Sequence, residues 1–277
     1  MTLWHQNCRS VCNKASDLCD TIDDNNVDLL ALSETWLKGD IRDKPVIAEL
    51  IPDGYSMHQA SRLSRGGGVA LVYKESIGMT VVRTSEWASF EVIECLSQAS
   101  PPLRVSVVYR PPTHGSDFNS FTHDFSEYLD QTVLLRGHLV IIGDFNIHLD
   151  DSTNRECIEF TELLQSFGLV QHVQQPTHKA GHLLDLVITK EENDMRPSVV
   201  IFDQCISDHH TLSCTLQVPP PAGGTARLIE YRNLKRINVD TFKDDIITAF
   251  PVDLNAADSN VDDCLRAYND KLHSLII

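Results

Sequence analysis

The segment that decides the fold is residues 138–148, which read HLVIIGDFNIH. Residues 138–142 have the apolar, β-branched character of a strand buried on both faces, and Gly143 marks a turn or a close backbone approach. Asp144 and Asn146 then lie at the end of this strand, where a carboxylate and a carboxamide can face one cavity and hold an anion, a metal ion or a water molecule. For this motif alone, an Asx turn that only caps the strand is an equal alternative.

The composition is that of a soluble globular protein, and its 277 residues leave room for one large domain or two smaller ones. No basic N-terminal segment precedes an apolar run, and no apolar run approaches the roughly 20 residues that a membrane span needs. We therefore expect a soluble, intracellular protein. The eight cysteines form no CxxC pair and no zinc-type Cys/His spacing, which favours reduced thiols. The net charge of −16 opposes nonspecific attraction to phosphate, so a nucleic acid would be held locally by a divalent metal ion and a few cations.

Polar residues end or interrupt other apolar segments in the same way. These residues are Asn7, Glu34, Tyr109, Asp185, Asp208 and His209. An acid inside an apolar run, as at Asp185, must be paired or hydrogen-bonded if it is buried. For Glu34, a capping role is as good an interpretation as a functional one. For Asp208 and His209, the alternative to a functional role is a polar turn between two strands.

Amphipathic spacing predicts surface helices over about 11–22, 117–134 and 155–167. The glycines at 66–68 precede a strand at 69–73 rather than a helix, which favours a tight turn over a phosphate-binding loop. Strands therefore dominate, and helices cover them.

The strand-end residues together are rich in hard oxygen ligands and include one imidazole, a set that suits Mg²⁺ or Mn²⁺ better than zinc. Metal-assisted phosphodiester cleavage needs a metal ion to neutralise the phosphate, an activated water, and a group that stabilises the pentacovalent state. The set of residues meets these requirements.

The ordered series NCRS, LSETWL, GGGVALVY, VVYRPP, IIGDFN, LLDLVIT and SDHH resembles the endonuclease/exonuclease/phosphatase superfamily, which includes DNase I-like and apurinic/apyrimidinic endonuclease-like proteins. Within it, the series looks like the endonuclease domain of LINE-type non-LTR retrotransposons. The resemblance implies a four-layered α/β sandwich over residues 1–218, in which two packed, mainly antiparallel sheets are flanked by helices and the site lies at one end.

The resemblance also implies roles for the strand-end residues. Glu34 would be the principal Mg²⁺ ligand, with Asn7 and Asp208 in or beside the metal site. Tyr109 would donate a hydrogen bond to a phosphate oxygen. One departure from many relatives is Pro112, which occupies a position that is often asparagine three residues after the tyrosine, so a contact from that position is not carried over.

The proton-transfer roles fall on the remaining residues. By resemblance, Asp144 would orient or deprotonate the attacking water, and Asn146 would help to hold the phosphate. His209 would bind the scissile phosphate or share the proton transfer, with Asp185 fixing its tautomer. The sequence leaves open whether Asp144 or the His209–Asp185 pair is the general base.

DNA is the expected partner, contacted by Arg62, Arg65 and Arg110, with no membrane and no small-molecule cofactor involved. A linker is expected at 219–226 and a helical connector at 227–277. This connector looks like the segment that precedes a reverse transcriptase domain, which is absent from this chain. A nuclear location is inferred from the DNA substrate only.

The leading interpretation is a Mg²⁺-dependent endonuclease that hydrolyses one DNA phosphodiester bond and leaves a nick with a 3′-hydroxyl. The alternatives are a catalytically silent relic or interaction domain, and a phosphatase or RNA nuclease of the same fold.

Overall fold

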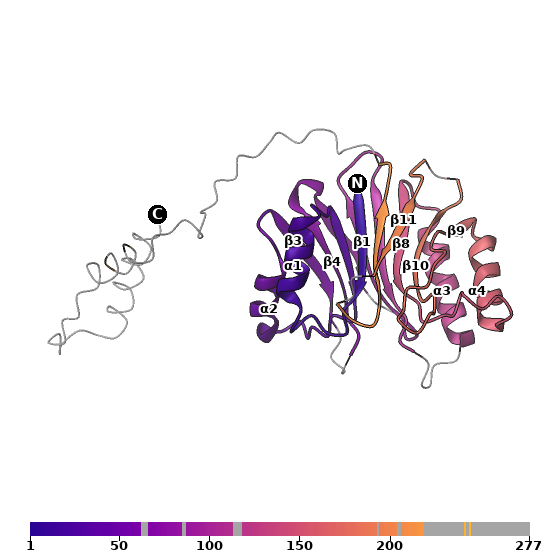
Figure 1. Cartoon of the computed structure of the whole chain (residues 1–277). Helices are drawn as coiled ribbons and strands as arrows, with labels where there is room; N and C mark the ends of the chain where they lie inside the picture. Colours follow the sequence, from indigo (N-terminus) through magenta and orange to yellow (C-terminus); the bar gives the residue numbers. More distant parts are fainter. Residues whose placement is uncertain are drawn as a thin grey trace. The chain divides into compact units, whose positions relative to one another are not determined.

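The computed structural model of the chain describes residues 1–61, 66–84, 87–112, 118–192, 194–203 and 206–218, together with residues 241 and 244 (Figure 1). The chain divides into two units, Met1–Thr225 and Ala226–Ile277. Apart from residues 241 and 244, the predicted linker at 219–226 and connector at 227–277 lie outside the described residues. Within the described ranges, no helix has the length and apolar character needed to cross a bilayer.

The first sheet has six strands in the order β11, β12, β1, β2, β4, β3. Its central strands, β1 (Thr2–Asn7) and β2 (Leu29–Ser33), run parallel, and the other neighbouring strands pair antiparallel. The flanking strands are β3 (Tyr55–Ala60), β4 (Val69–Lys74), β11 (Ser198–Phe202) and β12 (Thr211–Thr215).

The second sheet repeats this arrangement, with the order β5, β6, β7, β8, β10, β9. Here β7 (Leu103–Tyr109) and β8 (His138–Asp144) form the central parallel pair, and the remaining pairs are antiparallel. The flanking strands are β5 (Met79–Thr84), β6 (Glu91–Ser97), β9 (Leu169–Gln171) and β10 (Asp185–Lys190).

Helices cover the outer face of each sheet (Figure 1). The first sheet carries α1 (Ala15–Asp24) and α2 (Lys44–Leu50), and the second carries α3 (Phe118–Thr132) and α4 (Arg155–Ser166). Two short 3-10 turns, Ile41–Asp43 and Glu75–Ile77, complete the described helical segments. The helices predicted over 117–134 and 155–167 match α3 and α4, and the first predicted helix begins a turn later than expected.

The core lies in two regions, because alternate residues of the central strands face opposite sides of the sheet. Leu3 and Leu29 pack with the second sheet, whereas Trp4 and Leu30 pack under α1. The second region is smaller and is completed by the buried face of α1. The predicted α/β sandwich of two mainly antiparallel sheets is confirmed.

The chain between β2 and β4 contains Pro45, a residue typical of loops, and yet holds α2 and β3. Pro45 stands in the first turn of α2. Proline is tolerated there because the first N–H groups of a helix have no partner within the helix. Pro45 therefore fits within the first turn of this helix.

Candidate active site

Strand direction brings the predicted site residues to one edge of both sheets. Asn7 ends β1, and Glu34 directly follows its parallel neighbour β2. In the second sheet, Tyr109 ends β7 beside Asp144, the last residue of β8. Because β10 runs antiparallel to β8, its first residue, Asp185, pairs with Asp144. The ends of two parallel pairs and the start of an antiparallel strand therefore meet at one place.

The backbone at this edge adopts unusual conformations. Glu34 and Asn146 have φ values of 52° and 49°, in the left-handed region that non-glycine residues seldom adopt. At Gly143, a Cβ atom would lie 1.8 Å from the carbonyl oxygen of Val108, so only glycine fits between β7 and β8. The close approach predicted at Gly143 is confirmed, and it fixes the backbone directly before Asp144.

Asn7 links the two sheets through its side-chain amide. Its Nδ2 donates hydrogen bonds to Glu34 Oε1 at 3.0 Å and to Asp144 Oδ2 at 2.9 Å. Its Oδ1 accepts a hydrogen bond from the backbone N–H of Arg9 at 3.1 Å. Asn7 is fully buried, so this amide holds the two carboxylates in fixed positions.

The side-chain oxygens of Asp144 accept hydrogen bonds only from N–H groups. Besides the bond from Asn7, it accepts hydrogen bonds from the Asn146 backbone N–H at 3.0 Å and from Asn146 Nδ2 at 3.1 Å. Asn146 Nδ2 also donates to the carbonyl of Arg110 at 2.7 Å. Three N–H groups directed at one buried carboxyl group match the acceptor capacity of its ionised form.

Asp185 lies between two imidazoles. His209 Nδ1 donates to Asp185 Oδ2 at 2.8 Å, and the other ring nitrogen, Nε2, lies 3.9 Å from Asp144 Oδ2. On its other side, Asp185 Oδ1 is 3.5 Å from His5 Nδ1, and His5 Nε2 is 3.1 Å from Ser33 Oγ. Asp144, Asp185 and His209, all buried, form the buried cluster.

Burial and mutual charge shift the ionisation of these groups. Burial and repulsion from Asp185 raise the pKa of Asp144, with partial opposition from His209. Burial disfavours protonation of His209, but the charge of Asp185 and its hydrogen bond outweigh burial and raise the pKa of His209 to about 9. Burial lowers the pKa of His5 to about 4, so this ring is neutral near pH 7.

The buried cluster opens into a cleft of about 410 Å³. Residues lining the cleft include Glu34, Tyr109, Pro112, Asn146, Asp208 and His209. Burial and the charges of Glu34 and Asp144 raise the pKa of Tyr109 above its ordinary value, so its hydroxyl stays a donor. Trp36 Nε1 donates to Glu34 Oε2 at 3.3 Å and steadies that carboxylate at the wall of the cleft.

Asp208 makes its own contacts at the edge of the cleft. Its Oδ2 lies 2.6 Å from a guanidinium nitrogen of Arg9 and 3.4 Å from His178 Nε2. The ring of His178 packs edge-on against that of His209, with centroids 4.8 Å apart. Asp208 Oδ1 is buried and accepts no hydrogen bond.

A family model described as the Endonuclease/Exonuclease/phosphatase family matches residues 5–209, which include every predicted strand-end residue. The chain belongs to this family. Comparison with curated protein sequences finds no match.

Solved structures of this family share the fold at low sequence identity. An AP endonuclease, LMAP, from Leishmania major is 17% identical, with a TM-score of 0.64 over 79% of this chain and 88% of that one. The 3′ phosphatase NExo from Neisseria, bound to a product DNA hairpin, is 17% identical, with a TM-score of 0.59 over 79% and 100%. The endonuclease domain of TRAS1, a telomere-specific non-LTR retrotransposon, is 13% identical, with a TM-score of 0.57 over 78% and 97%.

The divalent metal ion implied by the family fits this donor set. The side chains are mainly carboxylates, which suit Mg²⁺ or Mn²⁺. Asp185 Oδ1 and Asp208 Oδ1 are buried oxygens with no hydrogen-bond donor, and the ligand atoms of the buried cluster lie within 4.8 Å of one another. Glu34 and these oxygens are the atoms available to a cation, whereas the amide nitrogen of Asn7 faces the two carboxylates.

The predicted contact of Arg110 with DNA is corrected. Arg110 is 1% exposed, and its guanidinium donates to the carbonyls of Phe145 at 3.3 Å and Asn146 at 3.0 Å. The rings of Phe118 and Phe121 pack against it. Arg110 therefore positions the loop that carries Asn146. Arg62 and Arg65 lie outside the described residues.

Two neighbours of the buried cluster were not predicted from the sequence. His5 lies inside an apolar strand segment, where an imidazole is the only sign of a role. His178 reaches His209 through an isolated antiparallel bridge between the two residues. Neither stands at the end of an expected strand, so the pattern that revealed the other residues did not apply to them.

Proposed function

We propose that this member of the family is a Mg²⁺-dependent endonuclease that nicks one DNA strand by hydrolysis and leaves a 3′-hydroxyl. The observation that carries the proposal is the set of contacts that joins Asn7, Glu34, Asp144 and the His209–Asp185 pair, of which Glu34 and His209 line one open cleft. Such a set supplies metal ligands, a proton acceptor and phosphate-binding donors together.

Glu34 is the side chain proposed to hold the metal ion, supported by its hydrogen bonds from Asn7 and Trp36. A bound Mg²⁺ would neutralise charge on the scissile phosphate and lower the pKa of a coordinated water. Tyr109, which keeps its proton, would donate to a phosphate oxygen at the wall of the cleft.

Proton transfer falls to Asp144 and His209. Asp144 is held by three N–H donors, so it is fixed in the orientation needed to accept a proton from an attacking water. His209, with its raised pKa, would carry a positive charge toward the phosphate, and Asp185 would hold its ring. We assign Asp144 as the base because its ionised form matches its donors.

A retrotransposon origin is part of the proposal. It is supported by the ordered motif series over residues 1–218 and by the fold shared with the TRAS1 endonuclease domain. DNA contacts from Arg62 and Arg65 remain proposals. Their importance follows from the net charge of −16, because local cations must offset that repulsion.

The test is nicking of supercoiled plasmid by the full chain with Mg²⁺ or with EDTA. We expect the wild type to nick only with Mg²⁺. His123→Ala should behave in the same way, because His123 is an exposed residue of α3 that is not among the residues lining the cleft. Asp144→Ala and His209→Ala should each lose about 10²–10⁴-fold, the usual contribution of a proton-transfer group. Extension of the nick by a DNA polymerase without prior end repair reports the 3′-hydroxyl.

Two results would contradict the proposal. A folded wild type that nicks no plasmid with Mg²⁺ or Mn²⁺, but releases phosphate from a monoester in a metal-dependent reaction, would be a phosphatase. A folded wild type with neither activity would be a catalytically silent relic or an interaction domain.

A further inference from the structure

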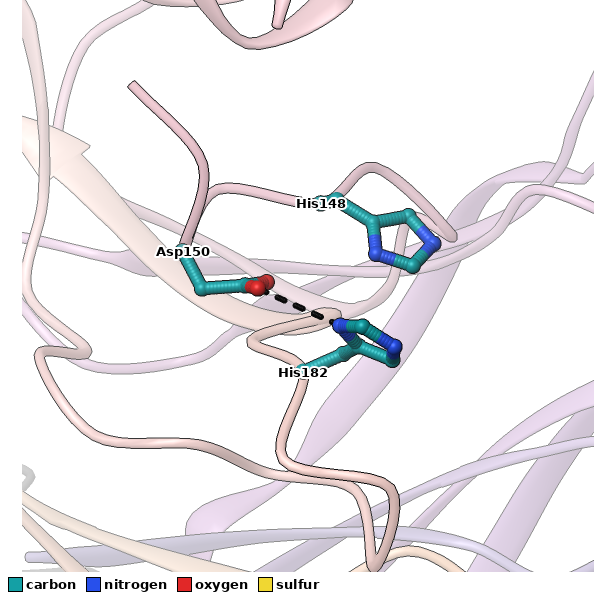
Figure 2. A group of neighbouring side chains, drawn as sticks. All are labelled: His148, Asp150 and His182. Carbon is teal, nitrogen blue, oxygen red and sulfur yellow. Dashed lines mark hydrogen bonds and ion pairs between the residues drawn. The ribbon is translucent and has the colours of Figure 1, made fainter. Parts of the chain in front are cut away.

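A second group of metal-ligating side chains lies outside the buried cluster. His148, Asp150 and His182 offer three ligand atoms within 4.8 Å of one another, and this group is called the rim cluster. Figure 2 shows the carboxylate of Asp150 directed at His182, with the ring of His148 beside that of His182. Asp150 Oδ2 lies 3.2 Å from His182 Nδ1, and the two imidazole centroids are 4.1 Å apart.

Backbone pairing holds the rim cluster together. Beyond the ends of β8 and β10, the two chain segments continue side by side: Phe145 N–H donates to the carbonyl of Leu184 at 3.0 Å, and Leu149 N–H donates to that of Leu183 at 3.2 Å. The Leu183 N–H then donates to Asp150 Oδ1 at 2.9 Å. The three side chains are thus brought together by fixed main-chain contacts.

Buried neighbours anchor both segments. Ile147 is fully buried and Leu183 is 6% exposed, whereas His148 and Asp150 are exposed and His182 is partly exposed. The alternation directs apolar residues into the core and the rim cluster toward solvent. A metal ion could therefore reach these ligands without any rearrangement of the backbone.

We propose that His148, Asp150 and His182 form a second divalent-metal site, one that takes an ion of the Zn²⁺ class. Two imidazoles and one carboxylate are a zinc ligand set, with the fourth position open to water or to another ligand. Bonds of about 2.0–2.1 Å in tetrahedral geometry place ligand atoms ~3.3 Å apart, and the Asp150–His182 separation of 3.2 Å already matches this value. The exposed ring of His148 completes the set by rotation.

The site differs in chemistry from the buried cluster. In the buried cluster two carboxylates accompany one imidazole, which favours hard cations. In the rim cluster two imidazoles accompany one carboxylate, which shifts the preference toward Zn²⁺. The two sites would therefore bind different ions from a mixture of Mg²⁺ and Zn²⁺.

The open position would face the same cleft as the catalytic groups, because His148 and His182 line that cleft with Glu34, Asn146 and His209. An ion held there would bind a phosphate oxygen of the nucleic acid beside the scissile group. This role rests on the proposed function, whereas binding of the ion itself does not.

The test is isothermal titration calorimetry, in which Zn²⁺ is added to the full chain in a buffer that contains excess Mg²⁺ and no nucleic acid. We expect the wild type and His123→Ala, a control whose exposed ring also lies beside two carboxylates, to bind Zn²⁺ with the same affinity. His148→Ala and His182→Ala should each weaken Zn²⁺ binding at least tenfold, since loss of an outer-shell partner alone costs about 10–100-fold. Asp150→Asn, which preserves the shape of the side chain, should also weaken binding.

A gain of signal gives an independent check. His182→Cys places a thiolate at the site, so Co²⁺ binding should produce a thiolate-to-metal charge-transfer band that the wild type lacks. Zn²⁺ binding of equal strength and stoichiometry in the wild type, His148→Ala, His182→Ala and Asp150→Asn would overturn the proposal, as would the absence of Zn²⁺ binding by the folded wild type. Because binding is measured without a substrate, inactivity toward DNA leaves this result unaffected.

Discussion

The two carboxylates of the buried cluster and all three side chains of the rim cluster come from the same two chain segments, but they lie in different environments. Asp144 and Asp185 face each other across the last register pair of β8 and β10. A few residues further, His148 and His182 extend from the same two segments at the surface. The pairing of β8 with β10 therefore positions the carboxylates of the first cluster and the whole of the second, whereas His209 comes from the segment before β12. The two groups differ in how deeply they are buried.

Burial makes the groups of the first cluster depend on one another. Each carboxylate there has a fixed set of donors, and the ionisation of Asp144 and His209 is set by mutual charge and by loss of water. In the rim cluster, Asp150 has one main-chain donor and one imidazole partner, and water supplies the rest. The same substitution should therefore have different consequences at the two places.

Asp144→Asn and Asp150→Asn compare the two clusters, because each variant replaces one carboxylate by a carboxamide of the same shape. Asn at 144 would direct its NH₂ group at one of the three N–H donors, so we expect a loss of about 1–3 kcal/mol of stability. Nicking should fall by about 10³-fold, because the proton acceptor is lost. Asn at 150 can still accept from the Leu183 N–H, so its stability should stay within about 0.5 kcal/mol of the wild type.

Urea unfolding at pH 7 in EDTA measures both stabilities, and plasmid nicking in Mg²⁺ measures the activity of the Asp144→Asn protein. Equal stability of the two variants would mean that the hydrogen bonds into Asp144 do not hold the buried cluster. Wild-type nicking by Asp144→Asn would remove Asp144 from the mechanism.

The residues of the buried cluster were predictable from the sequence because each stands where an apolar run meets a polar residue. Asp144, Asp185 and His209 share that pattern. Pairing of β8 with β10 then brings the two carboxylates together. His5 and the rim cluster lack it. The rim cluster forms only because segments more than 30 residues apart pair beyond their strands, which local periodicity does not report.

Arg110 shows a different reason for failure. An arginine after a strand and before two prolines has the features of a surface cation, and the sequence offers no sign that its charge is buried. Its burial depends on the rings of α3 and on groups farther along the chain, namely two loop carbonyls and Glu156 at 3.8 Å. Tertiary context decided the role of this residue.

Gly143 and Gly181 extend the comparison to the backbone behind each cluster. Alanine at 143 would place its Cβ 1.8 Å from the Val108 carbonyl oxygen, so β7 and β8 would have to separate. We expect a loss of about 3 kcal/mol or more. Gly181, beside His182, has a φ of 86° and open space around it, so Gly181→Ala should cost only the left-handed strain of about 1–2 kcal/mol.

Chemical denaturation of both glycine variants measures these losses, and their far-UV circular dichroism shows whether each remains folded. If Gly143→Ala is no less stable than Gly181→Ala, the close approach of β7 and β8 is not a constraint on the buried cluster. A Gly143→Ala protein that fails to fold at all agrees with the larger expected loss.

The pH dependence of stability gives a third way to separate the two clusters. The pKa of His209 rises from 6.5 unfolded to about 9 in the folded chain, and that of Asp144 is also raised. The metal-free native state therefore holds more protons than the unfolded chain, so its stability should fall by about 1–3 kcal/mol as the pH rises from 6.5 to 9. Below pH 6.5, the lowered pKa of His5 acts in the opposite direction.

Urea unfolding in EDTA across this pH range tests the expectation with two matched variants. His209→Gln removes the main titrating group, so its stability should depend less steeply on pH than that of the wild type. His182→Gln makes the same change in the rim cluster, where the ring is 39% exposed, and serves as the matched control. An unchanged slope in His209→Gln would show that the charges of the buried cluster are not coupled to folding, and the distinction between the two clusters would then rest on geometry alone.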